Sequence, residues 1–411
     1  MGSKRYGLSR RGFISGTGAA GGMAMHSAPL WDALPASRDP HLEVNVRAFG
    51  ARGDGVSDDT AAVQAAFDAV DGGSGAVFFP PGVYSVSSTL PVPSNTRLYG
   101  AGYSSTILGM KDNQIILSIA DCHRVLVESL RFTGTGRLGV AGRGAIWLAQ
   151  GKTAGPRDCR VSNCWIEGVG TSGIVVGNAS RCSVSSNVID GTAEHGIYLS
   201  ASSGCIVSNN TVRDAGRRGG VSTCVGIKIA DTTESTVIAN VVESPLTEGI
   251  VIEHGTARCT IMGNVVREAP QRAIRVNART TGIQITGNIL ARAMTEAIRV
   301  FGGTGCNITG NTIDSANNTA IAIDGPTRSA LITGNLIVTG PANGWTIRIS
   351  GSGHLVHGNY LAACDYGIFI DAKAKNIRLL YNQIEATKRA YTGVQNDNII
   401  IDVHDNLPRV R

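Results

Sequence analysis

The sequence predicts an all-β fold, a right-handed, single-stranded parallel β-helix of roughly 10–12 coils with a capping α-helix at its N-terminal end. Two observations lead to this prediction. A phrase of the form small residue, Ile, any residue x, aliphatic residue recurs ten times between residues 145 and 370. An asparagine recurs in step with it, at Asn163, Asn187, Asn210, Asn240, Asn264, Asn288, Asn311, Asn335, Asn359 and Asn382. Successive asparagines lie 23 or 24 residues apart, with one gap of 30, and such a fixed period is typical of stacked repeats.

Each repeat has the composition of short strands and turns. It carries two or three β-branched runs in period-two alternation, separated by Gly, Asn, Ser or Asp, and no apolar stripe long enough for a helix. If one repeat makes one coil, equal positions in successive coils lie about 4.8 Å apart. The asparagines then form an amide ladder, and Asn also tolerates the left-handed conformation of a tight turn. Four cysteines, each five residues before its asparagine, are expected in a buried column rather than in disulfides: Cys182, Cys205, Cys259 and Cys306.

The chain begins with an expected export signal. Ser9-Arg10-Arg11-Gly12-Phe13-Ile14 is a twin-arginine pattern, a mildly apolar Gly/Ala-rich run follows, and Leu34-Pro35-Ala36 offers a cleavage site. We expect residues 1–36 to be a Tat signal peptide and residues 37–411 to be one β-helix domain, periplasmic or secreted. A disordered basic N-terminus is the alternative. Loss of residues 1–36 lowers the formal net charge from +6 to +3, too mild to argue for nucleic acid, and no other segment is expected to span a membrane.

Residues 44–72 are expected to close the N-terminal end of the stack. They predict a strand, a glycine turn and one amphipathic helix, which Asp58 or Asp59 caps and whose apolar face is Ala62, Val63, Ala66 and Phe67. An uncovered end coil exposes core side chains and a strand edge. Regular coils are expected over residues 140–384 and a C-terminal end over residues 385–411.

This N-terminal region resembles a known family. Phe49-Gly50-Ala51, Gly53-Asp54-Gly55, Asp58-Asp59-Thr60 and Phe79-Pro80-Pro81-Gly82-Val83-Tyr84 are similar to the N-terminal signature of the pectate-lyase superfamily, over residues 44–110. The resemblance implies the right-handed β-helix fold and kinship with polysaccharide hydrolases, lyases, epimerases and phage tailspikes. It implies no particular reaction. The repeats contain no Asn-Thr-Asp, Gly-His-Gly or Arg-Ile-Lys of the polygalacturonases and no Asp-Pro-His of the alginate epimerases.

The repeated phrase is expected to form the functional face, because its two aliphatic residues point inward. We call the outward residue of each phrase the x column: Trp147, Val175, Tyr198, Lys228, Val251, Arg275, Arg299, Ala322, Arg348 and Phe369. The small residue of each phrase is expected to face outward as well, as a smooth floor. Polar residues gather between residues 195 and 299, a patch roughly 20–25 Å long. The long gap places an insertion, Asp214 to Cys224 with Arg217 and Arg218, beside Lys228.

Such a face suggests polysaccharide chemistry, foremost a lyase or epimerase acting on an acidic, uronate-containing glycan. This chemistry needs cations that neutralise the carboxylate and a base that removes the C5 proton. The candidate catalytic residues are Lys228, Arg275, Arg299, Glu253 and His195, with Tyr198 and His254 as alternative acid or base. The candidate substrate-binding residues are Tyr198, Arg272, Asn277, Glu248, Glu296, Arg217 and Arg218. No cofactor is required, and Ca²⁺ is an optional ligand of Glu248, Glu253 and Asn277.

Two alternatives stay open. A glycoside hydrolase needs paired carboxyl groups, for which Glu248 with Glu253, or Asp231 with Glu253, are the candidates. A non-catalytic carbohydrate-binding or structural β-helix needs no such pair, because alternating Glu and Arg also stabilise an exposed sheet. In that case Arg275 and Arg299 pair with Glu248 and Glu296. An enzyme should gather several titratable groups in one pocket, whereas a structural module should pair every charge.

Overall fold

A computed structural model describes residues 42–112, 114–137, 143–151, 154–216, 224–341, 344–393 and 399–401. All of them belong to one compact unit, Asp39–Arg411. The Tat signal expected over residues 1–36 lies outside the described residues. Within the described part of the chain, no helix has the length and apolar character that crossing a membrane requires.

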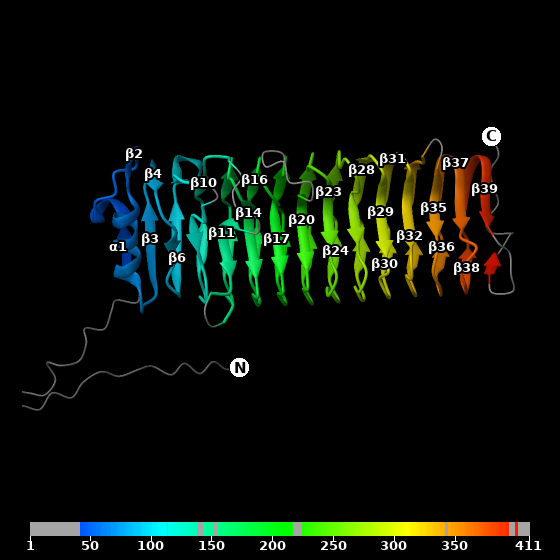
Figure 1. Cartoon of the computed structure of the whole chain (residues 1–411), viewed down its shortest axis with the longest axis horizontal. Coiled ribbons are helices and arrows are strands. Elements are labelled where there is room, and N and C mark those ends of the chain that lie inside the picture. The colour runs from blue at the N-terminus through cyan, green and yellow to red at the C-terminus, as the bar shows by residue number, and fades with distance from the viewer. Residues whose placement is uncertain are drawn as a thin grey trace, which may run out of the picture. The chain divides into compact units, whose positions relative to one another are not determined.

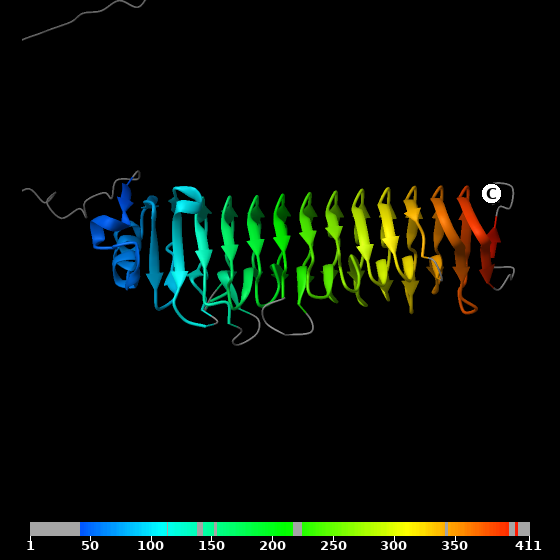
Figure 2. The ribbon, with the colours of Figure 1, turned by 90° about the horizontal axis from the view of Figure 1, so that it is seen from above.

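The described chain winds into stacked coils that follow one another along a single axis (Figure 1), and the view from above shows them in a row (Figure 2). The stack has about 13 turns, a little more than expected, because the residues before 140 form coils of their own. One face is a 15-stranded parallel sheet. Its strands are β1 (Leu42–Asn45), β3 (Gly75–Phe79), β6 (Thr96–Gly100), β9 (Leu126–Glu128), β12 (Arg160–Ser162), β15 (Ser183–Ser185), β18 (Ile206–Ser208), β21 (Thr236–Ile238), β24 (Thr260–Met262), β27 (Gln284–Thr286), β30 (Asn307–Thr309), β33 (Leu331–Thr333), β36 (Leu355–His357), β38 (Ile377–Leu380) and β40 (Ile399–Ile401).

The second face continues each coil after a turn. Its strands are β2 (Asp54–Asp58), β4 (Gly82–Val86), β7 (Ser105–Gly109), β10 (Arg131–Thr133), β13 (Trp165–Glu167), β16 (Val188–Asp190), β19 (Thr211–Arg213), β22 (Val241–Glu243), β25 (Val265–Arg267), β28 (Ile289–Ala293), β31 (Thr312–Ala316) and β34 (Leu336–Thr339).

The third face carries the repeated phrase. Its strands are β5 (Leu90–Pro91), β8 (Leu117–Ser118), β11 (Gly144–Ala149), β14 (Ser172–Gly177), β17 (Ile197–Ser200), β20 (Val225–Ala230), β23 (Glu248–Ile252), β26 (Ile274–Val276), β29 (Glu296–Phe301), β32 (Thr319–Asp324) and β35 (Trp345–Ile349). The long strands β37 (Tyr360–Ile370) and β39 (Gln383–Gly393) run through both the second and the third face.

The N-terminal end is closed by α1 (Thr60–Val70), next to the 3₁₀ turn η1 (Val46–Phe49); a second 3₁₀ turn, η2, spans Gly102–Ser104. α1 is the one α-helix among the described residues, and it buries Val63, Ala66, Phe67 and Val70 against the first coil. The two aspartates before α1 have different hydrogen-bond partners. Asp58 accepts a hydrogen bond from the Thr60 N–H at 3.0 Å, whereas Asp59 accepts from Arg52 and Gly53 and thereby holds the preceding turn.

The asparagine ladder is confirmed from Asn187 to Asn382, with one correction at its start. Each side-chain amide donates to the carbonyl oxygen of the next asparagine, at distances of 2.8 to 3.0 Å. Asn163 does not belong to the ladder, because the position before Asn187 is occupied by Cys164. Asn163 is exposed and adopts a φ of 53°. The left-handed residue of each turn is thus the one before the ladder position.

The core confirms the cysteine column and contradicts the expected floor of small residues. All nine cysteines are free and buried. The small residues of the phrase are buried too, at the corner between the second and third faces. A Cβ on Gly196 or Gly226 would lie 2.3 Å from Cγ1 of Val212 or Val242, and Ala273 is fully buried. The small size is therefore required by packing inside the corner and not by a ligand outside.

Candidate functional site

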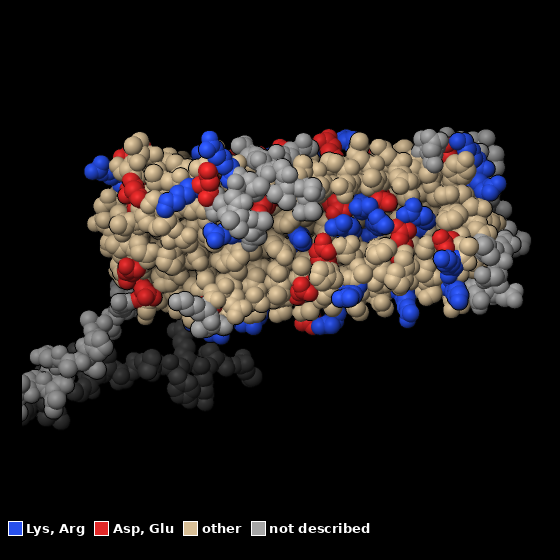
Figure 3. Space-filling view, viewed as in Figure 1, with Lys and Arg blue, Asp and Glu red and all other residues tan. Residues whose placement is uncertain are grey.

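The repeated strands keep the x column in register along the third face. Tyr198 pairs with Lys228, Lys228 with Val251, and Val251 with Arg275. The register continues without a shift through Arg299 to Phe369. Lys228, Arg275 and Arg299 therefore share one side of the solenoid, as the period predicted. Figure 3 shows basic and acidic side chains gathered in a strip over the region of β23 to β32.

A hollow of about 280 Å³ opens beside Lys228. Its lining residues are Val225, Lys228, Thr247, Glu248, Val251, Glu253, Gln271 and Arg275. They come from β20, β23 and β26, from the turns before β23 and β26, and, for Glu253, from the residue that follows β23. The hollow thus brings two cations and two carboxylates from three successive coils together, which is the gathering of titratable groups expected of an active site.

Lys228 forms no ion pair with any described residue. Its ammonium nitrogen lies 5.3 Å from the ring centroid of Tyr198, and the Tyr198 and His195 ring centroids lie 5.5 Å apart. A cation–π contact at an exposed site contributes a favourable interaction free energy of about 0.5–1 kcal/mol. Because the positive charge is held by a ring and not by a carboxylate, it remains available to an anionic ligand in the hollow.

His195 is a neutral hydrogen-bonding group. Its Nδ1 accepts a hydrogen bond from the Val225 N–H at 3.1 Å, so the neutral imidazole carries its proton on Nε2. Burial, and after it the positive charge of Lys228, lowers the pKa of His195 from 6.5 to about 3. The geometry therefore favours a role as a proton-bearing hydrogen-bond donor beside Tyr198. The expected role of His195 in proton transfer stays a prediction.

Acidification is expected to destabilise the protein through this histidine. The unfolded chain binds a proton at His195 below pH 6.5, whereas the folded protein does not until about pH 3. Unfolding is therefore coupled to proton uptake between these values, and the free energy of unfolding falls as the pH drops through that window. The loss is on the order of a few kcal/mol, since one pKa unit corresponds to about 1.4 kcal/mol. His354, whose pKa is also lowered by burial, contributes in the same direction.

The check is urea unfolding between about pH 7 and pH 4. His195→Asn keeps an oxygen that can accept from the Val225 N–H but removes the titrating group. Its free energy of unfolding should depend less steeply on pH than that of the wild type. Equal pH dependence of the two proteins would contradict the assignment.

The other charged side chains of the strip form ion pairs with one another. Arg272 contacts Glu248 at 3.0 Å and Glu296 at 2.9 Å. Arg275 contacts Glu248 at 3.1 Å and Glu253 at 3.4 Å. The side chains of Glu248 and Glu296 are only 3% and 6% exposed, so these carboxylates depend on their guanidinium partners. This pairing is what the structural alternative predicted for Arg275.

Arg272→Met is expected to lower the free energy of unfolding by about 2–3 kcal/mol, because it removes the guanidinium that two buried carboxylates share. Glu248 then keeps only Arg275, and Glu296 keeps only the longer contact of 3.8 Å with Arg348. The matched control is Arg258→Met. Arg258 pairs with Glu234 at 3.0 Å, but both side chains are more than 60% exposed, so the expected change is below about 1 kcal/mol. Thermal or urea unfolding of the two variants checks this. Similar losses in both would refute the difference in burial as the cause.

Arg299 has a different partner from the one expected. Its Nε contacts Asp324 at 2.9 Å, and Arg348 contacts the same carboxylate at 2.8 Å. Glu296, the expected partner, is held by Arg272 and lies 3.8 Å from Arg348. Arg299 does not line the hollow beside Lys228. The structure therefore places it one coil away from Arg275, in a pair with Asp324.

A second hollow of about 450 Å³ adjoins the first, since Glu253 lines both. Its other lining residues are His254, Asn277, Ala278, Arg279 and Phe301. Asn277 donates to Glu253 at 2.6 Å, and the His254 Nδ1 lies 3.9 Å from Glu253. The two hollows therefore lie next to each other on the third face, between β20 and β29.

The calcium expectation stays a prediction. The oxygens of Glu248 accept from Arg272 and Arg275, and those of Glu253 from Arg275 and Asn277. Binding of Ca²⁺ through these oxygens would require those contacts to open. Among the described residues, no group of three or more His, Cys, Asp or Glu side chains is placed to hold a metal ion.

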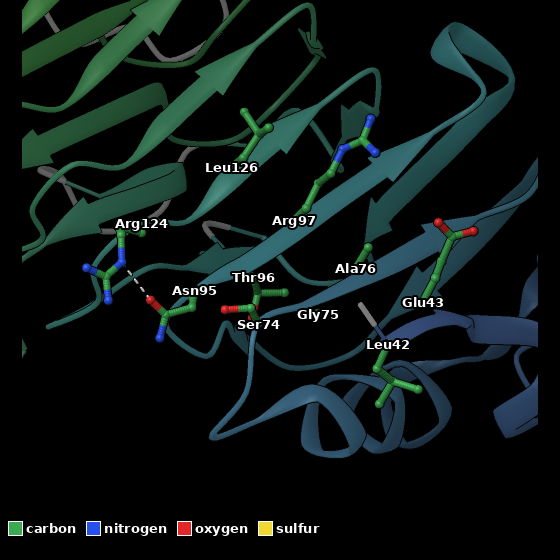
Figure 4. A pocket seen from close by; sticks show the side chains of 10 residues that line it. All are labelled: Leu42, Glu43, Ser74, Gly75, Ala76, Asn95, Thr96, Arg97, Arg124 and Leu126. Atoms are coloured by element: carbon green, nitrogen blue, oxygen red, sulfur yellow. Dashed lines mark hydrogen bonds between the residues drawn. The ribbon is translucent and has the colours of Figure 1, made fainter. Parts of the chain in front are cut away.

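A hollow of about 440 Å³ lies elsewhere, on the 15-stranded sheet near its N-terminal end (Figure 4). Its cations are already engaged. Arg124 donates to Asn95 at 2.8 Å, and Arg97 contacts Glu128 at 2.7 Å. We therefore place the candidate site on the third face, beside Lys228.

The structure brings most of the predicted residues together but does not place all of them. Lys228, Arg275, Glu253 and Glu248 line one hollow, and Tyr198 and His195 adjoin Lys228. Arg217 and Arg218 lie outside the described residues. So does Asp39-Pro40-His41, the one Asp-Pro-His of the chain. The prediction missed Thr247 and Gln271, which lie in turns before the repeated phrase, and the joint role of Asp324 and Arg348.

The fold and this concave polar face define a parallel β-solenoid with a groove along one sheet. Two family models match the chain. One, described as a right-handed β-helix region, matches residues 102–266 and 272–407. The other, described as rhamnogalacturonase A/epimerase, pectate lyase-like, matches residues 43–121. The chain belongs to the right-handed β-helix family, and its N-terminal region is pectate-lyase-like.

Relatives match over a short segment of the chain. Mannuronan C5-epimerase AlgE1 of Azotobacter vinelandii is 47% identical over 79 residues, which are 17% of this chain and 6% of the epimerase. Alginate lyase 7 of the same organism is 43% identical over 79 residues, 17% of this chain and 9% of the lyase. The matched segment therefore spans less than a tenth of either relative.

Solved structures match over most of the chain at low identity, which shows the fold alone. The A-module of mannuronan C5-epimerase AlgE6 of Azotobacter vinelandii has a TM-score of 0.65 and 18% identity, over 87% of this chain and 97% of the module. The catalytic unit of the GH87 α-1,3-glucanase of Streptomyces thermodiastaticus has a TM-score of 0.66 and 19% identity, over 89% of this chain and 70% of the glucanase chain.

Proposed function

We propose that the protein is a polysaccharide-active enzyme that removes the C5 proton of a uronate unit, as an epimerase or a lyase. The observation that carries the proposal is Lys228, a cation without a carboxylate partner among the described residues, in a hollow shared with Arg275. The similarity of a short segment of the chain to a mannuronan C5-epimerase and to an alginate lyase supports the same class.

The two basic side chains of the hollow, Lys228 and Arg275, suit the two parts of this reaction. A uronate carboxylate placed against the Arg275 guanidinium would be neutralised, which acidifies the proton at the neighbouring C5. A base then removes that proton, and the electron pair forms a double bond between C5 and the carboxylate carbon, so that the negative charge moves onto the carboxylate oxygens. Return of a proton to the opposite face of C5 gives the C5 epimer. If the electron pair instead forms a double bond between C4 and C5, the C4–O bond breaks, the departing oxygen takes up a proton, and the products are an unsaturated end and a shortened chain.

Lys228 is the residue that we assign to proton transfer, with Tyr198 beside it as the second candidate. Arg275 is assigned to the carboxylate, because an arginine keeps its proton throughout the physiological range. Its contacts with Glu248 and Glu253 fix the direction in which it faces the hollow. Export through the Tat pathway and the absence of a required cofactor remain parts of the proposal.

A non-catalytic glycan-binding or structural β-helix is the second candidate, favoured by one observation. Arg272, Arg275, Arg299 and Arg348 are all paired with carboxylates, which is the pattern of a stabilised sheet face. Hydrolysis is less well supported, because Glu248 and Glu253 both contact Arg275 and neither is free to protonate a leaving group.

The deciding experiment is a screen of the purified protein against uronate and neutral polysaccharides, with three product assays in parallel. Ultraviolet absorbance detects unsaturated ends, proton NMR in deuterium oxide detects C5 inversion with deuterium uptake, and a reducing-end assay detects hydrolysis. Unsaturated ends or deuterium uptake would support the proposal. New reducing ends without unsaturated ends would replace it by hydrolysis, and binding without any product would favour the second candidate.

A further inference from the structure

Three aromatic side chains form a platform on the third face, near the C-terminal end of the stack. Trp345 on β35 pairs in register with Tyr366 on β37, and Phe369 belongs to the x column beside them. The ring centroids of Trp345 and Tyr366 lie 5.0 Å apart, and those of Trp345 and Phe369 lie 5.6 Å apart. All three side chains are partly exposed. We call Trp345, Tyr366 and Phe369 the aromatic platform.

Packing of the core does not explain these rings. The residues of this face that fill the core are the aliphatic ones of the phrase, such as Ile347, Ile349 and Ile368, which are fully buried. The platform lies in the outward columns, in which the five coils before it, from Lys228 to Ala322, carry Lys, Val, Arg, Arg and Ala in the x column. Partly exposed aromatic faces next to one another are suited to the apolar faces of sugar rings.

Cations border the platform. Arg389 on β39 pairs in register with Tyr366 and is exposed. The Arg389 guanidinium donates a hydrogen bond to the Thr392 hydroxyl at 3.4 Å, and no described carboxylate pairs with it. The Lys388 ammonium lies 5.4 Å from the Tyr366 centroid and 2.9 Å from Asp365. A free guanidinium beside aromatic rings adds charge complementarity for an acidic glycan.

The platform is continuous with the candidate active site. From Lys228 to Phe369 the x column advances six coils, which is about 29 Å at about 4.8 Å per coil. Arg275, Arg299 and Arg348 lie between them in the same column. Phe301, 42% exposed, adds a ring about midway, with the Arg299 guanidinium 5.6 Å from its centroid.

We propose that the aromatic platform is a remote binding site for an acidic polysaccharide whose chain runs along the x column from the hollow at Lys228. The inference rests on the proposed function, because it takes the same glycan to reach both places. If so, the affinity of the protein for a glycan depends on the length of the glycan chain. A chain shorter than about 29 Å reaches only one of the two sites, whereas a longer chain engages both and gains from their linkage.

The test compares Trp345→Ala/Phe369→Ala with Tyr103→Ala, an exposed aromatic of η2 that lies outside the third face. Dissociation constants are measured for a size ladder of oligouronates from alginate and polygalacturonate, with neutral oligoglucans alongside. For uronate chains longer than about 29 Å the double variant should bind about tenfold more weakly, whereas Tyr103→Ala should bind as the wild type does. For short chains no variant should differ. Unchanged affinity of the double variant for long chains would overturn the proposal.

A second variant covers the case in which the double variant fails to fold. Arg389→Gln changes only an exposed side chain and should weaken binding of long uronate chains while leaving neutral glycans unaffected. Equal affinities of Arg389→Gln and wild type for long uronate chains would count against the platform. Analytical ultracentrifugation tests the alternative that a second copy of the chain, and not a glycan, covers the aromatic platform. If the platform variants abolish self-association and leave glycan affinity unchanged, a second copy of the chain covers this surface and the proposal falls.

The two proposals fail separately. If no glycan is turned over but the platform variants bind long uronate chains more weakly, the remote site stands without catalysis. If the wild type turns over a uronate glycan and the double variant has the same KM at every chain length, catalysis stands without the remote site.

Discussion

Lys228→Met is expected to lower kcat on the uronate substrate by about 10²–10⁴-fold, the usual contribution of a positioned acid or base. Methionine preserves most of the volume of the lysine side chain and removes the charge and the proton. The fold should survive, because Lys228 pairs with no described carboxylate. Steady-state kinetics checks the loss, with Lys375→Met, an exposed lysine outside the third face, as control. A kcat within a factor of two of the wild type would exclude Lys228 from catalysis.

Lys228→Arg separates the two roles open to this residue. An arginine keeps the positive charge but holds its proton too tightly to exchange it. If Lys228 transfers the proton, Lys228→Arg should lose turnover as fully as Lys228→Met and keep affinity for the substrate. If Lys228 only neutralises the carboxylate, Lys228→Arg should retain much of the activity. Then Tyr198 becomes the leading base, and Tyr198→Phe should be the inactive variant.

Asn264→Leu is expected to lower the free energy of unfolding by about 3–5 kcal/mol, at about 1–3 kcal/mol for each buried group left unsatisfied. The Asn264 side chain accepts from both the backbone N–H and the amide of Asn240, and it donates to Val237 and Asn288. Leucine fills the same space and makes none of these bonds. Because coils contact only their neighbours, the break should also split urea unfolding into two steps.

The matched control is Asn163→Gly. Asn163 lies one residue before the ladder position of its coil, is exposed and has a left-handed backbone. Glycine tolerates that conformation, so the expected change is within about 0.5 kcal/mol. A large loss in Asn163→Gly, or a loss below about 1 kcal/mol in Asn264→Leu, would contradict the ladder as a source of stability.

The period alone was enough to predict which residues become neighbours. Once a coil takes 23 or 24 residues, Lys228, Val251 and Arg275 must lie one above another, and the register confirms this. The 30-residue gap did not disturb the prediction, because the coil absorbs its extra residues before Val225 and the strand pairing resumes in step. The period of the repeats is therefore enough to predict the relative positions of residues along the stack.

Orientation at the corners and the choice of ion-pair partner could not be predicted in this way. Strict alternation assigns Gly196 to the outside, but the chain bends there, and the position faces Val212 of the neighbouring face. Arg299 has carboxylates on its own coil and on the next, and long side chains reach either. The choice of Asp324 over Glu296 depends on Arg272, which already occupies Glu296. Such competition is settled only by the packing of all the side chains together.

The asparagine column has a direction. From Asn187 to Asn359 each amide donates one hydrogen bond to the asparagine oxygen of the next coil and one to a backbone carbonyl of the preceding coil. Every amide oxygen in this series faces the N-terminal end, so the amide dipoles add head to tail and polarise one another. A coil can be inserted at any point of the asparagine ladder, provided that it carries one asparagine in the same orientation. Gain or loss of whole coils would preserve the ladder, whereas gain or loss of a fraction of a coil would interrupt it. The length of the solenoid is thus free to evolve in steps of one coil.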